Sequence, residues 1–203
     1  TVIVAEWQSG GRGRMGRPWH AGPGGTLTFS LLWRFPQGAG FLSGLSLAVG
    51  VALVRAFEAH GVADAGLKWP NDVVWAGSKL AGILIEMHGD MLGPSAAVIG
   101  VGVNVRLAER VRRRIDQPAV DLETACGRPI DRNLVFARIL NALGDALDVF
   151  SRDGFAAFRR EWQRHHVYQG LEVMLLMPDA SREKGVARGV ADDGALLLEM
   201  RTG

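Results

Sequence analysis

The sequence has little of what would mark a secreted or a membrane-inserted protein. Its 203 residues contain one cysteine, Cys126, so no disulfide can form within the chain and nothing calls for an oxidising compartment. No apolar run approaches the roughly 20 residues that a membrane-spanning helix needs. The first residues, 1–6, resemble a β-strand and not a cleavable leader. These absences predict a cytoplasmic globular protein with no membrane partner.

Acidic residues are missing from one long stretch of the chain. No Asp or Glu occurs between Trp7 and Phe57. Five arginines fall in this stretch: Arg12, Arg14, Arg17, Arg34 and Arg55. The net charge of the whole chain is only +2. A local positive field in an otherwise balanced chain suits an anionic ligand, and the balance argues against nucleic acid binding by charge alone.

The hydrophobic pattern predicts an α+β protein of two parts. We expect strands at 1–6, 26–33, 67–69, 73–75, 78–87 and 96–105, and helices at 41–60, 131–150 (capped by Asp131) and 154–166. Such closely spaced strands favour a mixed or antiparallel sheet. Short strands follow at 171–177, 185–190 and 195–200, separated by turns at Pro178-Asp179 and Asp192-Asp193-Gly194. The predicted domains are therefore 1–167, the larger one, and 168–203, a small β-barrel-like unit.

The most informative stretch is a glycine- and arginine-rich loop at residues 8–19, with the sequence QSGGRGRMGRPW. Glycines let the backbone wrap closely round a ligand, and the interleaved arginines offer planar forks to carboxylate and phosphate oxygens. The loop is expected to be mobile when free and to fold over an anion. The phosphate-binding pattern G-x-x-x-x-G-K-[ST] is absent. A solvated basic loop and an RNA-binding Arg-Gly tract are the alternatives.

A polar turn and two glycine-bearing strands complete the candidate site. The turn is Lys68-Trp69-Pro70-Asn71-Asp72, in which Trp69 is expected to anchor the turn in the core and Asp72 to help hold a hydrated Mg²⁺. The strands are 79–86, with the sequence KLAGILIE, and 100–104, with the sequence GVGVN. Their glycines leave room for a ligand beside the strand. A structural turn and a solvated lysine at a strand edge are the alternatives for these segments.

Together and in this order, these four segments resemble the biotin–protein ligase family over nearly all of the chain. The resemblance implies a fold related to class II synthetases, followed by a small SH3-like β-barrel. It also implies that biotin and ATP, with Mg²⁺, form biotinyl-adenylate, from which biotin passes to a lysine of a biotin carrier domain of acetyl-CoA carboxylase or a related carboxylase. A homodimer is plausible from the sheet edges.

The resemblance also assigns roles to individual residues. Arg14 and Lys79 are expected to be catalytic. The expected biotin-binding residues are Gln8, Gly11, Arg12, Gly13, Arg14, Lys79 and Gly82. The expected ATP-binding residues are Arg14, Arg17, Trp19, Lys68, Asn71, Asp72 and Asn104, with Asp72 as the metal contact through water.

The sequence departs from the family in three places. An upstream Ser-Thr segment that grips the biotin ring is expected to lie before Thr1, no adenine-facing aromatic is evident at 117–120, and the last strand of the small domain is expected to be missing. No DNA-binding domain is visible, and the basic run Arg110-Val111-Arg112-Arg113-Arg114 is interpreted as a solvated helix face or a loop over the nucleotide. A lipoate ligase or octanoyl transferase, and an RNA- or nucleotide-binding module, remain the alternative functions.

Overall fold

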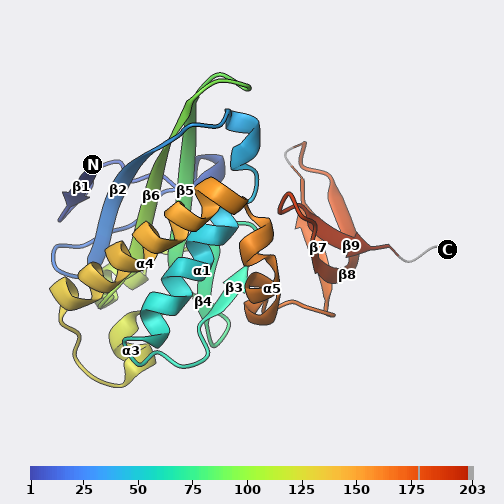
Figure 1. Cartoon of the computed structure of the whole chain (residues 1–203). Coiled ribbons are helices and arrows are strands. Elements are labelled where there is room, and N and C mark those ends of the chain that lie inside the picture. Colours follow the sequence, from blue (N-terminus) through green and yellow to red (C-terminus); the bar gives the residue numbers. More distant parts are fainter. Residues whose placement is uncertain (178, 201–203) are drawn as a thin grey trace.

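A six-stranded antiparallel sheet forms the centre of the protein (Figure 1). The structure is a computed structural model that describes residues 1–177 and 179–200. The strands lie in the order β1-β2-β6-β5-β4-β3. Their bounds are β1 Val2–Ala5, β2 Thr26–Phe35, β3 Gly66–Lys68, β4 Asp72–Trp75, β5 Ser78–Gly89 and β6 Ser95–Asn104. All six predicted strands are confirmed to within a few residues, and every pairing between them is antiparallel.

Three helices cover one face of this sheet. They are α1 (Leu45–Glu58), α4 (Arg132–Asp153) and α5 (Ala156–His165), and Figure 1 shows α1 and α4 side by side on the sheet. Helix α1 is apolar on nearly all sides because it packs between the sheet and the other two helices. Asp131 caps α4 as predicted, since its Oδ1 accepts from the amides of Asn133 at 2.9 Å and Leu134 at 3.2 Å.

The helix predicted at 41–60 is divided in the structure. A 3-10 helix, η2 (Ala39–Leu42), precedes α1, and Gly44 separates them with a φ of 77°. A Cβ on Gly44 would lie 2.6 Å from the Phe155 ring, so glycine is required there for space as well as for conformation. The apolar spacing runs through this break without interruption, which is why the pattern predicts one longer helix. Two short segments were not predicted, η1 (Arg14–Gly16) and α3 (Leu122–Cys126), whereas α2 (Glu109–Arg112) covers part of the basic run interpreted as a helix face or a loop.

A second, three-stranded antiparallel sheet follows α5. It consists of β7 (Glu172–Leu176), β8 (Arg182–Val190) and β9 (Leu196–Glu199), in that order. The three predicted strands are confirmed. Within the described residues they form an open three-stranded sheet and not a closed barrel. Pro178 of the predicted turn lies outside the described residues.

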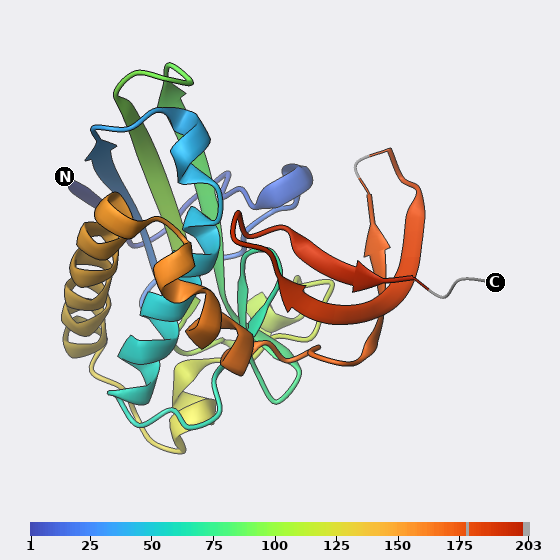
Figure 2. The ribbon, with the colours of Figure 1, turned by 45° about the vertical axis from the view of Figure 1, so that its right-hand side comes forward.

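This small sheet is fixed to the larger part of the molecule through its β8–β9 turn, which reaches toward the start of α1 (Figure 2). The carbonyl of Gly194 accepts a hydrogen bond from Trp69 Nε1 at 3.0 Å. A Cβ on Gly194 would lie 2.8 Å from Gly44 Cα, so the turn is packed directly against the backbone before α1. None of the helices within the described residues has the length and apolar character needed to cross a membrane.

Candidate functional site

A cleft of about 540 Å³ lies on the face of the main sheet that the helices leave free. Side chains alternate between the two faces of a strand. Accordingly Val98, Gly100 and Gly102 of β6 line the cleft, whereas Ile99 and Val103 are fully buried in the core beneath the helices. The main sheet therefore forms the floor of the cleft, and residues from other segments of the chain form its walls.

Two glycines make that floor flat enough for an indole ring to lie on it. Gly82 of β5 and Gly102 of β6 are directly opposite each other in the sheet. A Cβ on Gly102 would lie 2.4 Å from the Trp19 ring, and a Cβ on Gly82 would lie 3.6 Å from it. Any side chain at Gly102 would therefore displace Trp19. The room predicted beside these strands exists, and Trp19 occupies part of it.

The glycine- and arginine-rich loop folds back on itself as a small hairpin at the rim of the cleft. The Gly13 amide donates to the carbonyl of Arg17 at 2.7 Å, and the Trp19 amide donates to the carbonyl of Gly11 at 2.8 Å. The tip is the η1 turn, where Met15 and Gly16 have left-handed φ values of 56° and 72°. A Cβ on Gly11 would lie 2.7 Å from the Trp19 carbonyl, so glycine permits the close approach of the two arms.

This hairpin presents three exposed guanidinium groups around the cleft. Arg12, Arg14 and Arg17 all line it. Arg12 lies 3.9 Å from Glu86 in an exposed ion pair, a geometry that contributes little in water. Among the described residues, no carboxylate is paired with Arg14 or Arg17. Their positive charge is thus available to an anionic ligand.

Lys79 forms a close ion pair inside the cleft. Its Nζ lies 2.6 Å from Oδ1 of Asp72, and the two side chains are only 19% and 15% exposed. A bulge makes this pairing possible: Val73 lies opposite Ala81 and Val74 lies opposite Lys79, so Leu80 is an extra residue in β5. In a regular strand, side chains three residues apart point to opposite faces. The bulge instead brings Lys79 onto the face of Gly82, and a Cβ on Gly82 would lie 3.0 Å from Lys79 Cε.

The polar turn that supplies Asp72 is held on both sides. The side-chain Nδ2 of Asn71 donates to the carbonyl of Ile83 at 2.6 Å, and Ser46 Oγ donates to the carbonyl of Pro70 at 3.1 Å. The Trp69 indole, which we expected to anchor the turn, packs against the core and bonds to Gly194. These contacts fix the turn between the main sheet, helix α1 and the small sheet.

Most of the residues predicted from the sequence meet at this cleft. The predicted residues that line it are Gln8, Arg12, Gly13, Arg14, Arg17, Trp19, Lys68, Asn71, Asp72, Lys79 and Gly82. Gly11 lies within the hairpin against the backbone of Trp19 and is not among the lining residues, and Asn104 is 2% exposed. The Asn104 amide nitrogen donates to the carbonyls of Lys79 at 3.2 Å and Val120 at 3.0 Å. Asn104 therefore supports the backbone beneath Lys79 in this structure.

Several lining residues were not expected from the sequence. Thr28 and Ser30 of β2 face the cleft, as does Gln117. Hydroxyls two residues apart in a predicted strand are a usable signal for Thr28 and Ser30. The apolar residues of β7, Met174 to Leu176, also line the cleft, and nothing in a short apolar strand predicts that position. Lys68 also lines the cleft, and its Nζ lies 5.9 Å from the centre of the Tyr168 ring.

Comparison with known proteins bears directly on this cleft. Residues 1–104 match the sequence profile of the Biotin/lipoate A/B protein ligase family. The bifunctional ligase/repressor BirA of Escherichia coli is 35% identical over 198 residues, which cover 98% of this chain and 61% of that protein. The chain thus spans less than two thirds of that relative's length. The biotin–[acetyl-CoA-carboxylase] ligase of Mycobacterium tuberculosis is 34% identical over 206 residues, which cover 98% of this chain and 73% of that protein.

A solved structure agrees with these sequence matches. The biotin protein ligase from Aquifex aeolicus in complex with biotin and ATP superposes with a TM-score of 0.83 at 29% identity, covering 98% of this chain and 82% of that one. The likeness extends across both sheets. The chain therefore belongs to the biotin/lipoate A/B protein ligase family, among the biotin protein ligases.

Proposed function

We propose that the protein is a biotin–protein ligase. It forms biotinyl-5'-AMP from biotin and ATP, and then transfers biotin to a specific lysine of a carboxylase biotin carrier domain. The observation that carries this proposal is the convergence of Lys79 and the arginine-rich hairpin on one glycine-floored cleft. Cations from separate segments of the chain line one cleft with a partly apolar floor, which suits two anionic substrates that each carry a ring.

The proposed biotin side of the cleft is the hairpin and the strand floor. Its residues are Gln8, Gly11, Arg12, Gly13, Arg14, Lys79 and Gly82. The proposed nucleotide side is Arg14, Arg17, Trp19, Lys68, Asn71, Asp72 and Asn104. Gly11 and Asn104 do not line the cleft. We propose that they contribute by holding the backbone of the residues that do. The other residues are placed to touch the substrates themselves.

In the first half-reaction, an oxygen of the biotin carboxylate attacks the α-phosphorus of ATP, the mixed anhydride forms and pyrophosphate leaves. Two anions have to meet, so the ammonium of Lys79 and the guanidinium of Arg14 offset their repulsion and stabilise the charge that builds at phosphorus. Asp72 holds Lys79 in place for this role. In the second half-reaction, the carrier lysine amine attacks the anhydride carbonyl, AMP leaves and the amine loses a proton.

A magnesium ion fits the nucleotide side through Asp72. The described residues contain no group of three or more His, Cys, Asp or Glu arranged to hold a metal by themselves. One oxygen of Asp72 already lies against Lys79, which leaves the other to accept from the water shell of an ion held mainly by phosphate oxygens. When bound, the ion would supply neutralisation of the phosphate charge.

We also make proposals about the location, the domain boundaries and the oligomeric state of the protein. We place the protein in the cytoplasm, divide it into a catalytic domain at 1–167 and a small domain at 168–203, and assign the β7–β9 sheet to an SH3-like barrel. The exposed edge strand β1, in which Ile3 is 69% exposed, offers a surface for a homodimer. The two separate sheets support the division into two domains, and the exposure of β1 supports the homodimer.

Pyrophosphate release from ATP tests the proposed function. Release is expected to require biotin, to be unaffected by RNA, and not to be supported by lipoate. A carrier domain added with biotin and ATP is expected to become reactive toward streptavidin. Lipoate-dependent release with no response to biotin would instead favour a lipoate ligase of the same family, and release that requires neither would exclude both.

A further inference from the structure

The backbone of Lys79 is held from below by a segment that no site prediction includes. The Lys79 amide donates to the carbonyl of Pro118 at 2.9 Å, and the Val120 amide donates to the carbonyl of Lys79 at 3.0 Å. This is a parallel bridge between Lys79 and Ala119, at the start of β5. Asn104 ties the carbonyls of Lys79 and Val120 together from the end of β6. The position of Lys79 therefore depends on where residues 118–120 lie.

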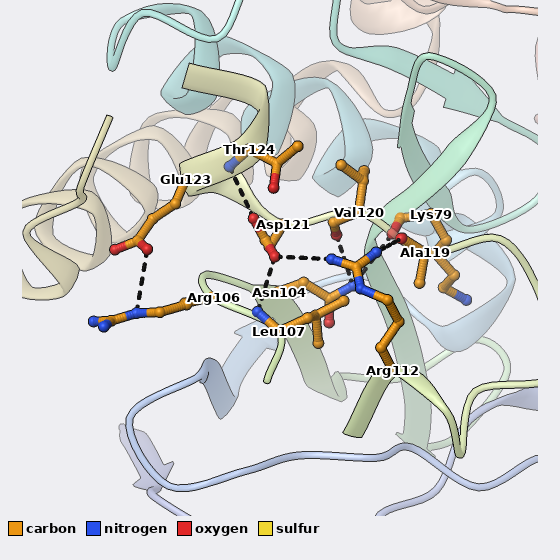
Figure 3. A network of polar contacts seen from close by, with 10 residues as sticks. All are labelled: Lys79, Asn104, Arg106, Leu107, Arg112, Ala119, Val120, Asp121, Glu123 and Thr124. Carbon is orange, nitrogen blue, oxygen red and sulfur yellow. Dashed lines mark hydrogen bonds and ion pairs between the residues drawn. The ribbon is translucent and has the colours of Figure 1, made fainter. Parts of the chain in front are cut away.

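Residues 118–120 are in turn fixed by one ion pair, drawn in Figure 3. Arg112 Nη1 donates to the carbonyl of Ala119 at 2.6 Å, and Arg112 Nη2 donates to Oδ2 of Asp121 at 3.2 Å. The Asp121 side chain is 6% exposed and also accepts from the amides of Leu107 at 2.9 Å and Thr124 at 2.8 Å. Charge-assisted hydrogen bonds between a guanidinium group and a buried carboxylate are among the stronger polar contacts in proteins.

The other arginines of the basic run behave differently. Arg113 pairs with Glu109 one helical turn away, and both side chains are more than half exposed. That pair fits the interpretation of the run as a solvated helix face. Arg112 does not, because its guanidinium turns inward to Ala119 and Asp121. One member of the run is thus committed to the backbone beneath the cleft.

We propose that Arg112 and Asp121 are positioning residues for Lys79. They hold residues 118–120 against the start of β5, and this sets the distance of the Lys79 ammonium from the reacting carboxylate and phosphate. An electrostatic contribution to catalysis depends on such pre-set geometry, and small misplacements reduce the rate. The proposal rests on the proposed biotin-ligase function, since Lys79 has to act in adenylation for its position to matter.

A double-mutant cycle tests the proposal. Single-turnover formation of biotinyl-adenylate from biotin and ATP is measured for the unmutated chain, Arg112→Ala, Lys79→Ala and the double variant. Arg112→Ala is expected to lower the rate roughly tenfold in the unmutated chain, and by no more than about twofold in the Lys79→Ala background. An equal tenfold loss in both backgrounds would show that Arg112 acts without Lys79 and would overturn the proposal. An unchanged rate in Arg112→Ala would overturn it as well.

A matched control and two further variants sharpen the result. Arg113→Ala removes the same charge from the neighbouring residue, which caps the end of the same short helix, and is expected to leave the rate within about twofold of normal. Asp121→Asn can still accept from the Thr124 amide through its one oxygen, but it loses the charge and the oxygen that accepts from Leu107 and Arg112. It is therefore expected to give a loss that also vanishes without Lys79. If Arg112→Ala does not fold, Arg112→Lys takes its place in the cycle with the same two outcomes. Absence of any biotin-dependent adenylate from the unmutated chain would reject the proposed function itself.

Discussion

At the scale of single residues, the cleft is organised by charge. The ion pair between Lys79 and Asp72 is mostly shielded from water, whereas the arginines of the hairpin are exposed around it. A shielded ammonium interacts more strongly with a nearby anion than an exposed one does. Lys79 is therefore the cation best placed to act on charge that develops during reaction, while Arg12 and Arg17 are better suited to attracting and holding the substrates.

Replacing Lys79 by alanine is expected to slow adenylation far more than it weakens ATP binding. The charge that Lys79 stabilises is present mainly in the transition state, so the loss is expected to be roughly 30-fold or more, or about 2 kcal/mol in the barrier. Single-turnover rates and equilibrium ATP titration measure the two effects separately. Lys184→Ala, at an exposed position in β8, is the control. Normal turnover of Lys79→Ala would restore the interpretation of an ordinary strand lysine.

The residues of this site were predictable to different degrees. Lys79 and Asp72 were both singled out, yet their pairing was not, because it depends on the bulge at Leu80 that a period of two cannot reveal. Asn104 was predicted from its place after the glycine strand, but its burial depends on the segment at 118–120. Short motifs thus identify which residues matter, whereas register and long-range backbone contacts decide what each side chain touches.

At the scale of elements, the hairpin of residues 8–19 stands out because few contacts hold it to the sheet. Its own hydrogen bonds link its two arms, and its arginines are exposed. Its best anchor is Trp19 against Gly102. The elements with strong periodicity, such as β6 and α4, were predicted closely because their burial repeats along the chain. The break at Gly44 was not, since the Phe155 contact that requires it comes from more than a hundred residues away.

Hydrogen exchange is expected to be fast across residues 8–19 in the free protein and to slow markedly when biotin and ATP are present. A segment with few buried contacts opens readily, and a bound anion gives its arginines partners. Mass spectrometry of the exchanged peptides provides the measurement, with β6 as an internal reference that is protected in both states. If the hairpin exchanges equally slowly with and without the ligands, the expected ordering on binding does not occur.

At the scale of the whole molecule, two buried histidines make stability depend on pH. Burial lowers the pKa of His60, and the nearby guanidinium groups of Arg138 and Arg128 lower it further. Burial also lowers the pKa of His166, partly opposed by a hydrogen bond with Gln169. An unfolded histidine has a pKa of about 6.5. Just below that pH, each of these histidines is still neutral in the folded chain, whereas the same residue in the unfolded chain takes up a proton.

The free energy of unfolding is accordingly expected to be full above about pH 6.5 and to fall as the pH is lowered toward the folded-state pKa values, because the unfolded chain binds more protons in that window. His166 stacks on Trp162 with ring centres 4.6 Å apart, so His166→Phe keeps the ring and removes the titration. Denaturant unfolding at pH 7.5 and 5.5 is expected to show a smaller loss for this variant. An identical loss in both proteins would exclude His166 as a source of the dependence.

The two sheets meet at the turn that carries Asp72, so the small sheet adjoins the proposed nucleotide side of the cleft. Trp69 donates to the Gly194 carbonyl at 3.0 Å and stands two residues from Asn71 and three from Asp72. Residues Met174 to Leu176 of β7 line the same cleft. Neither contact was predicted, because a sequence pattern assigns strands to sheets without saying where the sheets touch. We therefore expect docking of the small sheet and the proposed binding of ATP to support each other.

Trp69→Phe tests that coupling, since it keeps a smaller aromatic ring in the turn and removes the donor to Gly194. We expect stability to fall by about 1 kcal/mol, the usual effect of one lost hydrogen bond. We also expect a several-fold higher KM for ATP and little change in KM for biotin, because the turn lies on the nucleotide side. Trp75→Phe is the matched control: its indole donates to the Ala63 carbonyl at 2.9 Å, away from the small sheet. That variant should lose similar stability and keep a normal KM for ATP. If both variants raise the KM for ATP equally, the effect follows from general loosening of the fold, and the contact between the sheets has no special part in binding the nucleotide.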